Sequence, residues 1–184
     1  MSKIIAAINV TLDGYCDHTA VTPDADIHEH YTELLQSASQ ILYGRITYQL
    51  MEFWPPLVKK PSGEKNLDDF ARVIDKLPKL VFSNTVTALD WPSAQLATKS
   101  LEETVQQLRK ENEKDVLVGS RSLIIALLNR GLLDELQLCI YPVLAAKGLP
   151  LFEKIKKRVE MKYIKTKHFP SSGAMLVYYD TRQQ

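Results

Sequence analysis

The sequence predicts one α/β domain over residues 1–184, with a central, mostly parallel sheet flanked by helices and antiparallel strands at its C-terminal end. A chain of 184 residues suits one domain and is too short for two full-sized ones. Short apolar runs alternate with segments of helical periodicity, which is typical of parallel sheets. After residue 158 the pattern changes to two longer strand-like stretches around Pro170–Gly173, which predicts an antiparallel hairpin.

The predicted strands are apolar runs bounded by turn residues. Asp13 and Gly14 follow the first run, and Pro142 ends the last run of the parallel part. The buried strands expected in the parallel sheet are Lys3–Val10, Gln40–Tyr43, Lys79–Phe82, Asp115–Val118 and Leu136–Tyr141. The hairpin strands are expected over Val159–His168 and Ala174–Tyr179.

The predicted helices are recognised by apolar residues three and four positions apart and by their end signals. Asp24 or Asp26 is available as an N-cap, Ser100 and Glu103 form a capping box, and Gly131 is a typical C′ glycine. Four of the expected helices are Ile27–Ser37, Leu67–Leu77, a segment beginning at Leu101, and Leu123–Arg130. A further helix is expected after Gly44; it carries Ile46, Leu50 and Phe53 and stops at Pro55.

Composition excludes several classes of protein. Lys and Arg total 23 against 22 Asp and Glu, and this balance argues against a nucleic-acid or anionic-membrane binder. No window approaches the roughly 20 apolar residues that span a bilayer. Cys16 and Cys139 have no metal-ligand spacing and are expected to be free thiols, Cys139 within the core. With no signal-peptide pattern at the start, the sequence predicts a cytoplasmic protein.

Glycine-led turns follow two of the predicted parallel strands and open directly into helices. They are Gly44-Arg45-Ile46-Thr47 and Gly119-Ser120-Arg121-Ser122. Such a turn points free amide groups and the positive end of a helix dipole at an anion, and the arginines add charge. Because ligands of open parallel sheets bind beyond the carboxyl ends of the strands, these turns predict a phosphate-bearing ligand.

The glycine patterns of standard Rossmann and P-loop sites do not occur in the sequence. The third predicted strand ends in Ser83-Asn84-Thr85, where an NAD-selective Rossmann site would place an acidic residue. These side chains, together with Arg45, are suited to holding a 2′-phosphate. The sequence therefore favours NADP over NAD.

Together these segments resemble the dihydrofolate reductase-like superfamily. The segments that carry the resemblance are Ile4–Gly14, Leu42–Tyr48, Trp54-Pro55, Lys79–Thr85, Val118-Gly119 and Gly131–Leu136, with Pro142 and Leu151-Phe152. The most similar branch is the reductase domain of the riboflavin-biosynthesis bifunctional deaminase–reductase and its stand-alone relatives. The resemblance spans nearly the whole chain in order, and the deaminase domain with its zinc-binding signature is absent from it.

The resemblance implies NADPH as cofactor and assigns residues to it. Gly44, Arg45 and Thr47 match the turn that binds the pyrophosphate and the neighbouring 2′-phosphate. Ser83, Asn84 and Thr85 match the group around the adenine ribose phosphate. Gly119, Ser120, Arg121 and Ser122 match the second phosphate-binding turn. Ala6 or Ala7 would line the nicotinamide pocket, with Ala7 taken as the contact.

Two departures from the superfamily pattern bear on the chemistry. The usual Gly-Gly pair, which carries a cis peptide in dihydrofolate reductase, is Gly119-Ser120 here, so that a cis bond at this position is a prediction to be tested. Dihydrofolate reductase also has a carboxylate on its first helix that helps to protonate the pterin. No residue aligns convincingly with it; Asp13 and Asp26 are taken as catalytic candidates, and Asp24 and His28 lie near the same pocket.

The sequence leaves three functional hypotheses open. The first is an NADPH-dependent reductase of a small pterin- or pyrimidine-type substrate, homodimeric as relatives in this branch commonly are. The second is a non-catalytic NADP(H)- or nucleotide-binding module of the same fold. The third and weakest is a metal-dependent enzyme built on Asp24, Asp26, His28 and His30. Each candidate also has a purely structural interpretation: a turn residue for Asp13, an N-cap for Asp26, a core anchor for Trp54 and a solvated cation for Arg121.

Overall fold

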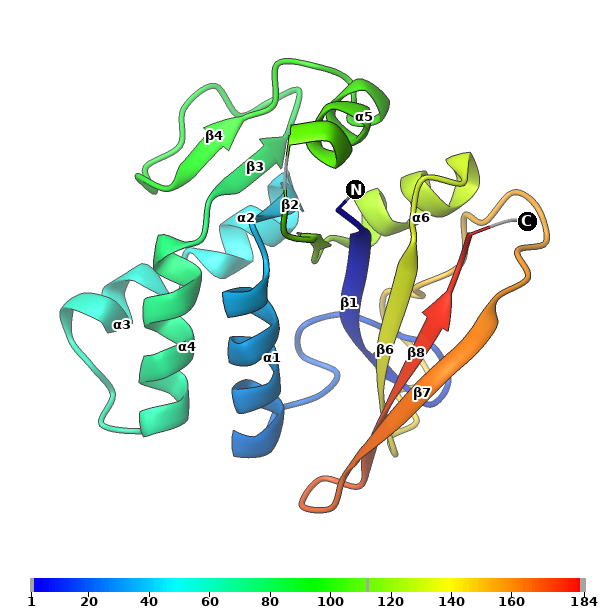
Figure 1. Cartoon of the computed structure of the whole chain (residues 1–184). Coiled ribbons are helices and arrows are strands. Elements are labelled where there is room, and N and C mark those ends of the chain that lie inside the picture. The colour runs from blue at the N-terminus through cyan, green and yellow to red at the C-terminus, as the bar shows by residue number, and fades with distance from the viewer. Residues whose placement is uncertain (1, 112, 183–184) are drawn as a thin grey trace.

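A single eight-stranded sheet organises the computed structural model, which describes residues 2–111 and 113–182 (Figure 1). The strands lie in the order β4-β3-β2-β5-β1-β6-β8-β7. They are β1 (Ile4–Thr11), β2 (Gln40–Gly44), β3 (Lys79–Phe82), β4 (Ala94–Leu96), β5 (Val116–Val118), β6 (Glu135–Tyr141), β7 (Lys162–Phe169) and β8 (Ala174–Asp180). The helices are α1 (Ala25–Ser37), α2 (Arg45–Met51), α3 (Pro55–Lys59), α4 (Lys65–Lys76), α5 (Leu101–Glu111) and α6 (Arg121–Arg130).

The predicted mixture of parallel and antiparallel strands is confirmed. β1 pairs in parallel with β5 and β6, β2 with β5 and β3, and β3 with β4. Among the described residues, the antiparallel ladders are those that β8 forms with β6 and with β7. The carboxyl ends of six strands therefore lie along one edge of the sheet, where the loops after β1, β2, β3, β5 and β6 emerge.

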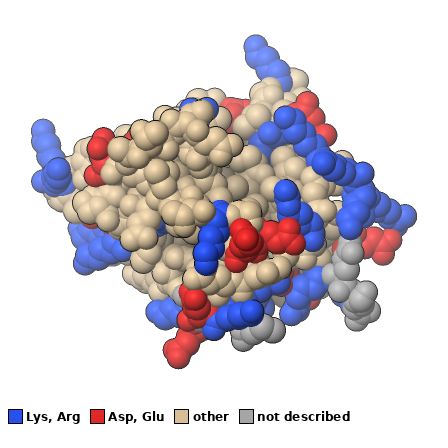
Figure 2. All heavy atoms as spheres, turned by 90° about the horizontal axis from the view of Figure 1, so that it is seen from above, with Lys and Arg blue, Asp and Glu red and all other residues tan. Residues whose placement is uncertain are grey.

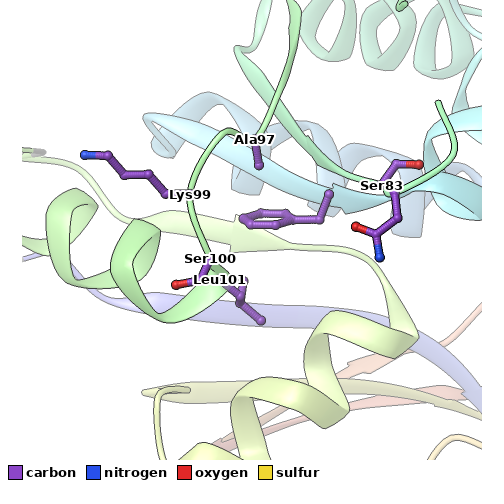
Figure 3. A pocket seen from close by; sticks show the side chains of 7 residues that line it. Ser83, Ala97, Lys99, Ser100 and Leu101 are labelled. Carbon is purple, nitrogen blue, oxygen red and sulfur yellow. The ribbon is translucent and has the colours of Figure 1, made fainter. Parts of the chain in front are cut away.

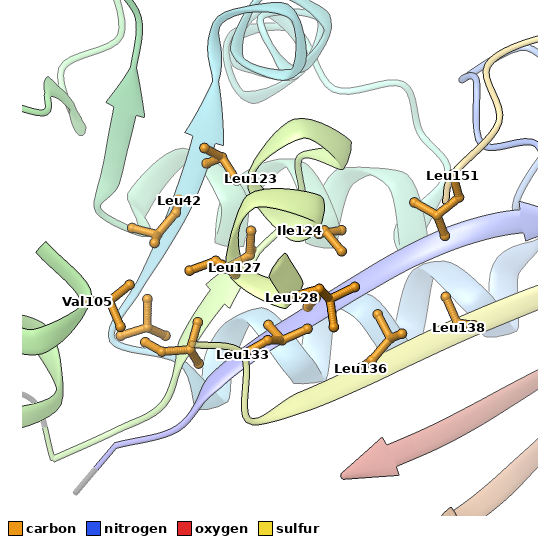
Figure 4. Packing of buried hydrophobic residues seen from close by; sticks show 14 of the residues in the cluster. Leu42, Val105, Leu123, Ile124, Leu127, Leu128, Leu133, Leu136, Leu138 and Leu151 are labelled. Atoms are coloured by element: carbon orange, nitrogen blue, oxygen red, sulfur yellow. The ribbon is translucent and has the colours of Figure 1, made fainter. Parts of the chain in front are cut away.

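Each face of the parallel sheet has its own hydrophobic core, because successive strand residues point to opposite faces. On one face, Leu42 and Leu136 of the sheet pack with Ile124 and Leu127 of α6 (Figure 4). On the other face, Tyr43 and the remaining alternate strand residues pack against α1 and α4. A third cluster around Phe169 and Cys139 joins α1 to β6 and to the C-terminal hairpin.

Helix-end signals in the sequence are confirmed. Asp24 accepts a hydrogen bond from the amide of Ile27 and caps α1. Ser100 and Glu103 exchange the reciprocal bonds of a capping box at the start of α5. Gly131 ends α6 with a left-handed φ of 65°, which a glycine adopts without steric strain.

The middle of the chain differs from the prediction in the extent of one helix and contains one strand that was not predicted. The helix after Gly44 ends at Met51, and Pro55 begins the short helix α3, where its missing amide hydrogen and fixed φ are favourable. In α2, Tyr48 is buried, whereas Ile46 and Leu50, and Phe53 after the helix, are exposed. β4 was not expected, since three residues are too few to show a period.

Two further observations concern the apolar character of the helices and the distribution of surface charge. Within residues 2–111 and 113–182, none of the helices has both the length and the apolar character needed to cross a membrane. On the face shown in Figure 2, Lys and Arg stand mostly around the margin with Asp and Glu among them. That face therefore has no continuous basic surface.

Candidate functional site

The two glycine-led turns meet at the edge formed by the carboxyl ends of β2 and β5. The amide of Gly44 donates a 2.7 Å hydrogen bond to Ser120 Oγ, which is buried. A Cβ atom on Gly44 would lie 3.1 Å from Ser122 Oγ, so that only glycine fits here without displacing a neighbour. The two turns therefore form one continuous surface, as expected from the order of the strands.

Both turns leave the first amides of their helices free of a side-chain cap. Gly44 at the start of α2 has no side chain that could cap the helix, and Ser120 at the start of α6 makes no capping hydrogen bond with its side chain. Thr47 lies half-buried in the first turn of α2. Uncapped amides beside hydroxyl groups are suited to an anion.

The peptide between Gly119 and Ser120 is trans, as are all the peptide bonds that the structure describes. The prediction of a cis bond is wrong. A cis bond to a residue other than proline costs about 3 kcal/mol. Here Ser120 adopts ordinary extended angles (φ −106°, ψ 125°) and accepts the bond from Gly44, so the turn is closed without that conformation.

The arginines of the two turns have different environments. Arg45 is exposed, and its Nη1 donates to Gln49 Oε1 on the next turn of the same helix. Arg121 is largely covered: Nε donates to the carbonyl oxygen of Pro150 and Nη2 contacts Glu153. Arg45 is therefore available to a ligand, whereas Arg121 holds the loop after β6 against the sheet.

A pocket of about 380 Å³ lies at the carboxyl end of β3 (Figure 3). Ser83 and Asn84 line one side. The other side is lined by residues of the loop after β4 and the start of α5, namely Ala97, Lys99, Ser100 and Leu101. Gly44 pairs with Phe82, so Arg45 and Ser83 leave the sheet at the same level on neighbouring strands. Ser83 Oγ accepts the amides of Thr85 and Val86, which holds this turn at the rim.

Lys99 and Ser100 were not singled out as ligand-binding residues from the sequence. Lys99 is exposed, and its ammonium group donates to Gln107 Oε1 on α5. The strand β4 brings these residues beside Ser83, since it pairs with β3 in parallel. The position of Lys99 just before a capping box is the only signal in the sequence, and it does not point to a ligand.

Ala7 lies in β1 between β5 and β6. It is half-buried and pairs with Gln137, which places it on the face of the sheet that α1 covers. Ala6, by contrast, is fully buried in the core beneath α6. Of the two residues, Ala7 is therefore on the side where a ligand between α1 and the sheet would lie.

The carboxylates taken as catalytic candidates make structural hydrogen bonds. Asp13 accepts from Thr11 Oγ1 and from the amides of Ala145 and Ala146. The Thr11 hydroxyl, more than these amides, holds the pKa of Asp13 below its usual value. Asp26 is exposed on α1 and accepts from Ser171 in the hairpin.

A third carboxylate, that of Asp24, has one oxygen without a partner. Its Oδ1 caps α1, while Oδ2 is buried and has no hydrogen-bond partner. The hydroxyl of Tyr141, at the end of β6, is likewise buried without a partner. Burial raises the pKa of the Cys139 thiol to about 12, and the Asp24 charge adds to the effect. Burial followed by the charges of Cys139 and Asp24 also raises the pKa of Tyr141.

The remaining candidates have structural surroundings. Trp54 packs against Phe70, with ring centroids 4.4 Å apart, and against the edge of His28. Because Asp24, Asp26, His28 and His30 are at the start of a helix, they do not share one face. In the described part of the chain, no three His, Cys, Asp or Glu side chains are grouped so that they could hold a metal ion.

Comparison with known proteins identifies the family. Residues 2–174 match the family described as the RibD C-terminal domain. The chain belongs to this family. An uncharacterized protein of Bacillus subtilis strain 168, YyaP, is 34% identical over 185 residues, covering 96% of this chain and 94% of YyaP.

Solved structures share the fold at low sequence identity. A putative riboflavin biosynthesis protein from Shewanella sp. PV-4 superposes with a TM-score of 0.74 at 19% identity, with 100% of both chains covered. RibD from Acinetobacter baumannii gives a TM-score of 0.72 at 14% identity; the match covers 100% of this chain and 59% of that one. The chain thus spans about three-fifths of that protein and all of the Shewanella protein.

Proposed function

We propose that the protein is an NADPH-dependent reductase that transfers a hydride to a small pyrimidine- or pterin-type substrate. The observation that carries the proposal is the pocket at the end of β3, lined by Ser83, Asn84, Lys99 and Ser100. Hydroxyl and amide donors in one pocket, with Lys99 in its lining and Arg45 on the neighbouring strand, fit a ribose phosphate better than a free ribose hydroxyl. Membership of the RibD C-terminal domain family supports a reductase.

Each group of residues at this edge is assigned to one part of the cofactor. Phe82, Ser83 and Asn84 with Lys99 are assigned to the adenosine 2′-phosphate half, and Thr85 holds the turn of Ser83. The turns at Gly44–Thr47 and Gly119–Ser122 are assigned to the pyrophosphate, with Arg45 shared between the pyrophosphate and the 2′-phosphate. Ala7 is assigned to the nicotinamide end. The cofactor supplies the hydride, and the protein supplies position and charge.

Asp24 fits the role of proton donor better than the two carboxylates first considered. Asp13 and Asp26 already accept hydrogen bonds from other parts of the chain. Asp24 Oδ2 and the Tyr141 hydroxyl are buried without partners beside the carboxyl ends of β1 and β6. Asp24, with Tyr141 beside it, is assigned to proton delivery to a substrate nitrogen on the α1 side of the sheet, the side of Ala7.

The cofactor assignment is tested by thermal-shift titration of the wild type, Lys99→Met and Lys60→Met with NADPH and NADH. Lys60 is an exposed lysine outside the pocket and serves as the matched control. A ligand at 100 times its Kd stabilises a protein by about 2.7 kcal/mol, so binding is easily detected. We expect stabilisation by NADPH that Lys99→Met weakens and Lys60→Met preserves. No response of the wild type to NADPH would overturn the proposal.

Oxidation of NADPH with a ribosylaminopyrimidine or dihydrofolate separates the enzyme from its alternative. Turnover with either compound supports the reductase, and loss of turnover in Asp24→Asn with NADPH binding intact supports the proton donor. Binding of NADPH without turnover on either compound favours the non-catalytic nucleotide-binding module.

We further propose that the protein is a homodimer, which light scattering in solution tests directly. We also propose a cytoplasmic location, since the free thiols Cys16 and Cys139 fit a reducing compartment.

A further inference from the structure

Asn9 is an amide side chain within the apolar strand β1. It lies between Ile8 and Val10, although asparagine is generally depleted in strands. Successive strand residues point to opposite faces, so Asn9 lies on the same face as Ala7, the face that α1 covers. The side chain is only partly buried. A polar group at this position requires polar partners on that face of the sheet.

Tyr31 of α1 is one such partner. Its hydroxyl donates a 2.8 Å hydrogen bond to Asn9 Oδ1. Burial first, and then the neighbouring Cys139 and Tyr141, raise the pKa of Tyr31 well above its usual value, so the phenol keeps its proton and acts as the donor. This bond fixes the orientation of the amide, because the oxygen accepts from Tyr31 and the nitrogen is directed elsewhere.

The amide nitrogen of Asn9 has no partner of its own. Within residues 2–111 and 113–182, Nδ2 makes no hydrogen bond, and it is not one of the unpartnered atoms that are sealed from solvent. A ligand can therefore reach its two hydrogens. A purely structural role of Asn9 as partner of Tyr31 uses the oxygen alone and does not account for the nitrogen.

Asn9 lies between the residues assigned to the nicotinamide and those assigned to proton delivery. Ala7 is two positions earlier in β1, about 7 Å along the strand. On the neighbouring strand Cys139 pairs with Asn9. Burial, with the added charge of Asp24, raises the pKa of the Cys139 thiol, which places that carboxylate close to it. A substrate ring that takes a hydride at the Ala7 end and a proton at the Asp24 end therefore passes Asn9 Nδ2.

The chemistry of the amide nitrogen decides which substrate atom can face it. An amide nitrogen donates hydrogen bonds and does not accept them, so the substrate atom opposite Nδ2 is an acceptor. A ring carbonyl oxygen meets this requirement. An exocyclic amino group would direct its own hydrogens at those of Asn9 and leave both donors unpaired. A site built to bond one polar group strongly rejects the analogue that lacks it.

We propose that Asn9 is a specificity-determining residue, which donates from Nδ2 to a carbonyl oxygen of the substrate ring, and that Tyr31 is the positioning residue that holds the amide in this orientation. The inference rests on the proposed function and restricts its substrate class to pyrimidines or pterins that carry a ring carbonyl at this position. Analogues with an amino group in its place are rejected.

The test is a protein-observed NMR titration of the isotope-labelled protein saturated with NADP⁺, so that no turnover occurs. The ligands are two matched pairs, uracil with cytosine and pterin with diaminopteridine; in the second member of each pair an amino group replaces a ring carbonyl. Asn9→Asp keeps an oxygen for the Tyr31 hydroxyl and replaces the donor nitrogen by an oxygen. Tyr31→Phe removes the orienting bond and keeps the ring. Asn66→Asp, the same chemical change in the first turn of α4, is the matched control.

In the wild type we expect a carbonyl ligand to shift the side-chain amide resonances of Asn9 and to bind at least tenfold more tightly than its amino counterpart. Asn9→Asp should abolish or reverse this preference, because its donor is gone while the contact with Tyr31 remains. Tyr31→Phe should reduce the preference, and Asn66→Asp should leave it unchanged. Thermal stabilisation of each variant by NADPH is measured in parallel as the readout of an intact fold.

Three results would overturn the proposal: no binding of either carbonyl ligand to the wild-type complex, equal affinities within both pairs, or the wild-type preference in Asn9→Asp. If Asn9→Asp does not fold, an unchanged preference in Tyr31→Phe overturns it. These results leave the response of the wild type to NADPH intact, and the cofactor assignment with it. Absence of that response overturns the proposed function itself.

Discussion

The turns after β2 and β5 have nearly the same sequence pattern, a glycine followed within two residues by an arginine and three residues later by a hydroxyl residue, but the two arginines make different contacts. Arg45 is exposed and contacts only Gln49 on its own helix. Arg121 is tied to Pro150 and Glu153 across a sequence separation of about thirty residues. The comparison teaches that a motif can predict an anion-binding backbone, whereas the availability of its cation depends on what the rest of the chain places next to it.

Arg45→Ala should have the largest effect on binding. Removing an exposed cation beside the 2′-phosphate is expected to raise the Kd for NADPH at least tenfold, about 1.4 kcal/mol, and to leave NADH nearly unchanged. Isothermal titration with both cofactors measures it, and Gln49→Ala, which removes the contact of Arg45 on the same helix, serves as control. Equal weakening for NADPH and NADH would remove the 2′-phosphate role of Arg45.

Ser120→Ala tests the contact that joins the two turns. The buried amide of Gly44 loses its acceptor, and we expect the free energy of unfolding to fall by about 2 kcal/mol. Urea denaturation measures this change. Ser122→Ala, at the same turn, keeps the hydrogen bond between Gly44 and Ser120 and is expected to be milder. An equal loss in both variants would contradict the role given to Ser120.

Arg121→Ala is expected to show the reverse of Arg45→Ala. Loss of the bond to the Pro150 carbonyl should lower the free energy of unfolding by about 1.5 kcal/mol, and the NADPH-to-NADH preference should stay within about twofold of wild type. Glu153→Gln is the control, because it removes the exposed ion pair, worth little in water, and keeps the bond to Pro150. A large loss of NADPH preference with unchanged stability would make Arg121 a ligand cation after all.

The smallest predicted effect is on the pH dependence of stability. The pKa of His30 is lowered to about 4 by burial, and an unfolded histidine takes up its proton near pH 6.5. The unfolded state therefore binds more protons between pH 6.5 and 4, and stability is lost as the pH falls through this range. Compared with His30→Gln, the wild type should lose about 1–2 kcal/mol more between pH 7 and pH 5, measured by urea unfolding; a parallel pH dependence would contradict it.

Much of the fold could be predicted from the sequence because periodicity and end signals act locally. The strand Lys79–Phe82 has the predicted bounds, and the capping box at Ser100 forms as expected. β4 was missed because its three residues are defined by pairing with β3 and not by their own pattern.

The candidate site was harder to predict from the sequence than the fold, because packing decides which polar atoms remain without hydrogen-bond partners. Asp24 and Asp26 are two positions apart and both acidic, yet only Asp24 has a buried oxygen without a partner. Lys99 comes beside Ser83 only through β4, and the hydrogen bonds of Asp13 come from a loop more than a hundred residues away. The spacing of these residues along the chain does not predict the contacts.

The central claim is that this edge of the sheet recognises the 2′-phosphate of NADPH, and the ratio of the Kd values for NADH and NADPH tests it most directly. Isothermal titration of the wild-type protein at moderate salt gives both constants under the same conditions. The account predicts that NADPH binds at least tenfold more tightly than NADH. Equal affinities, or tighter binding of NADH, would contradict it.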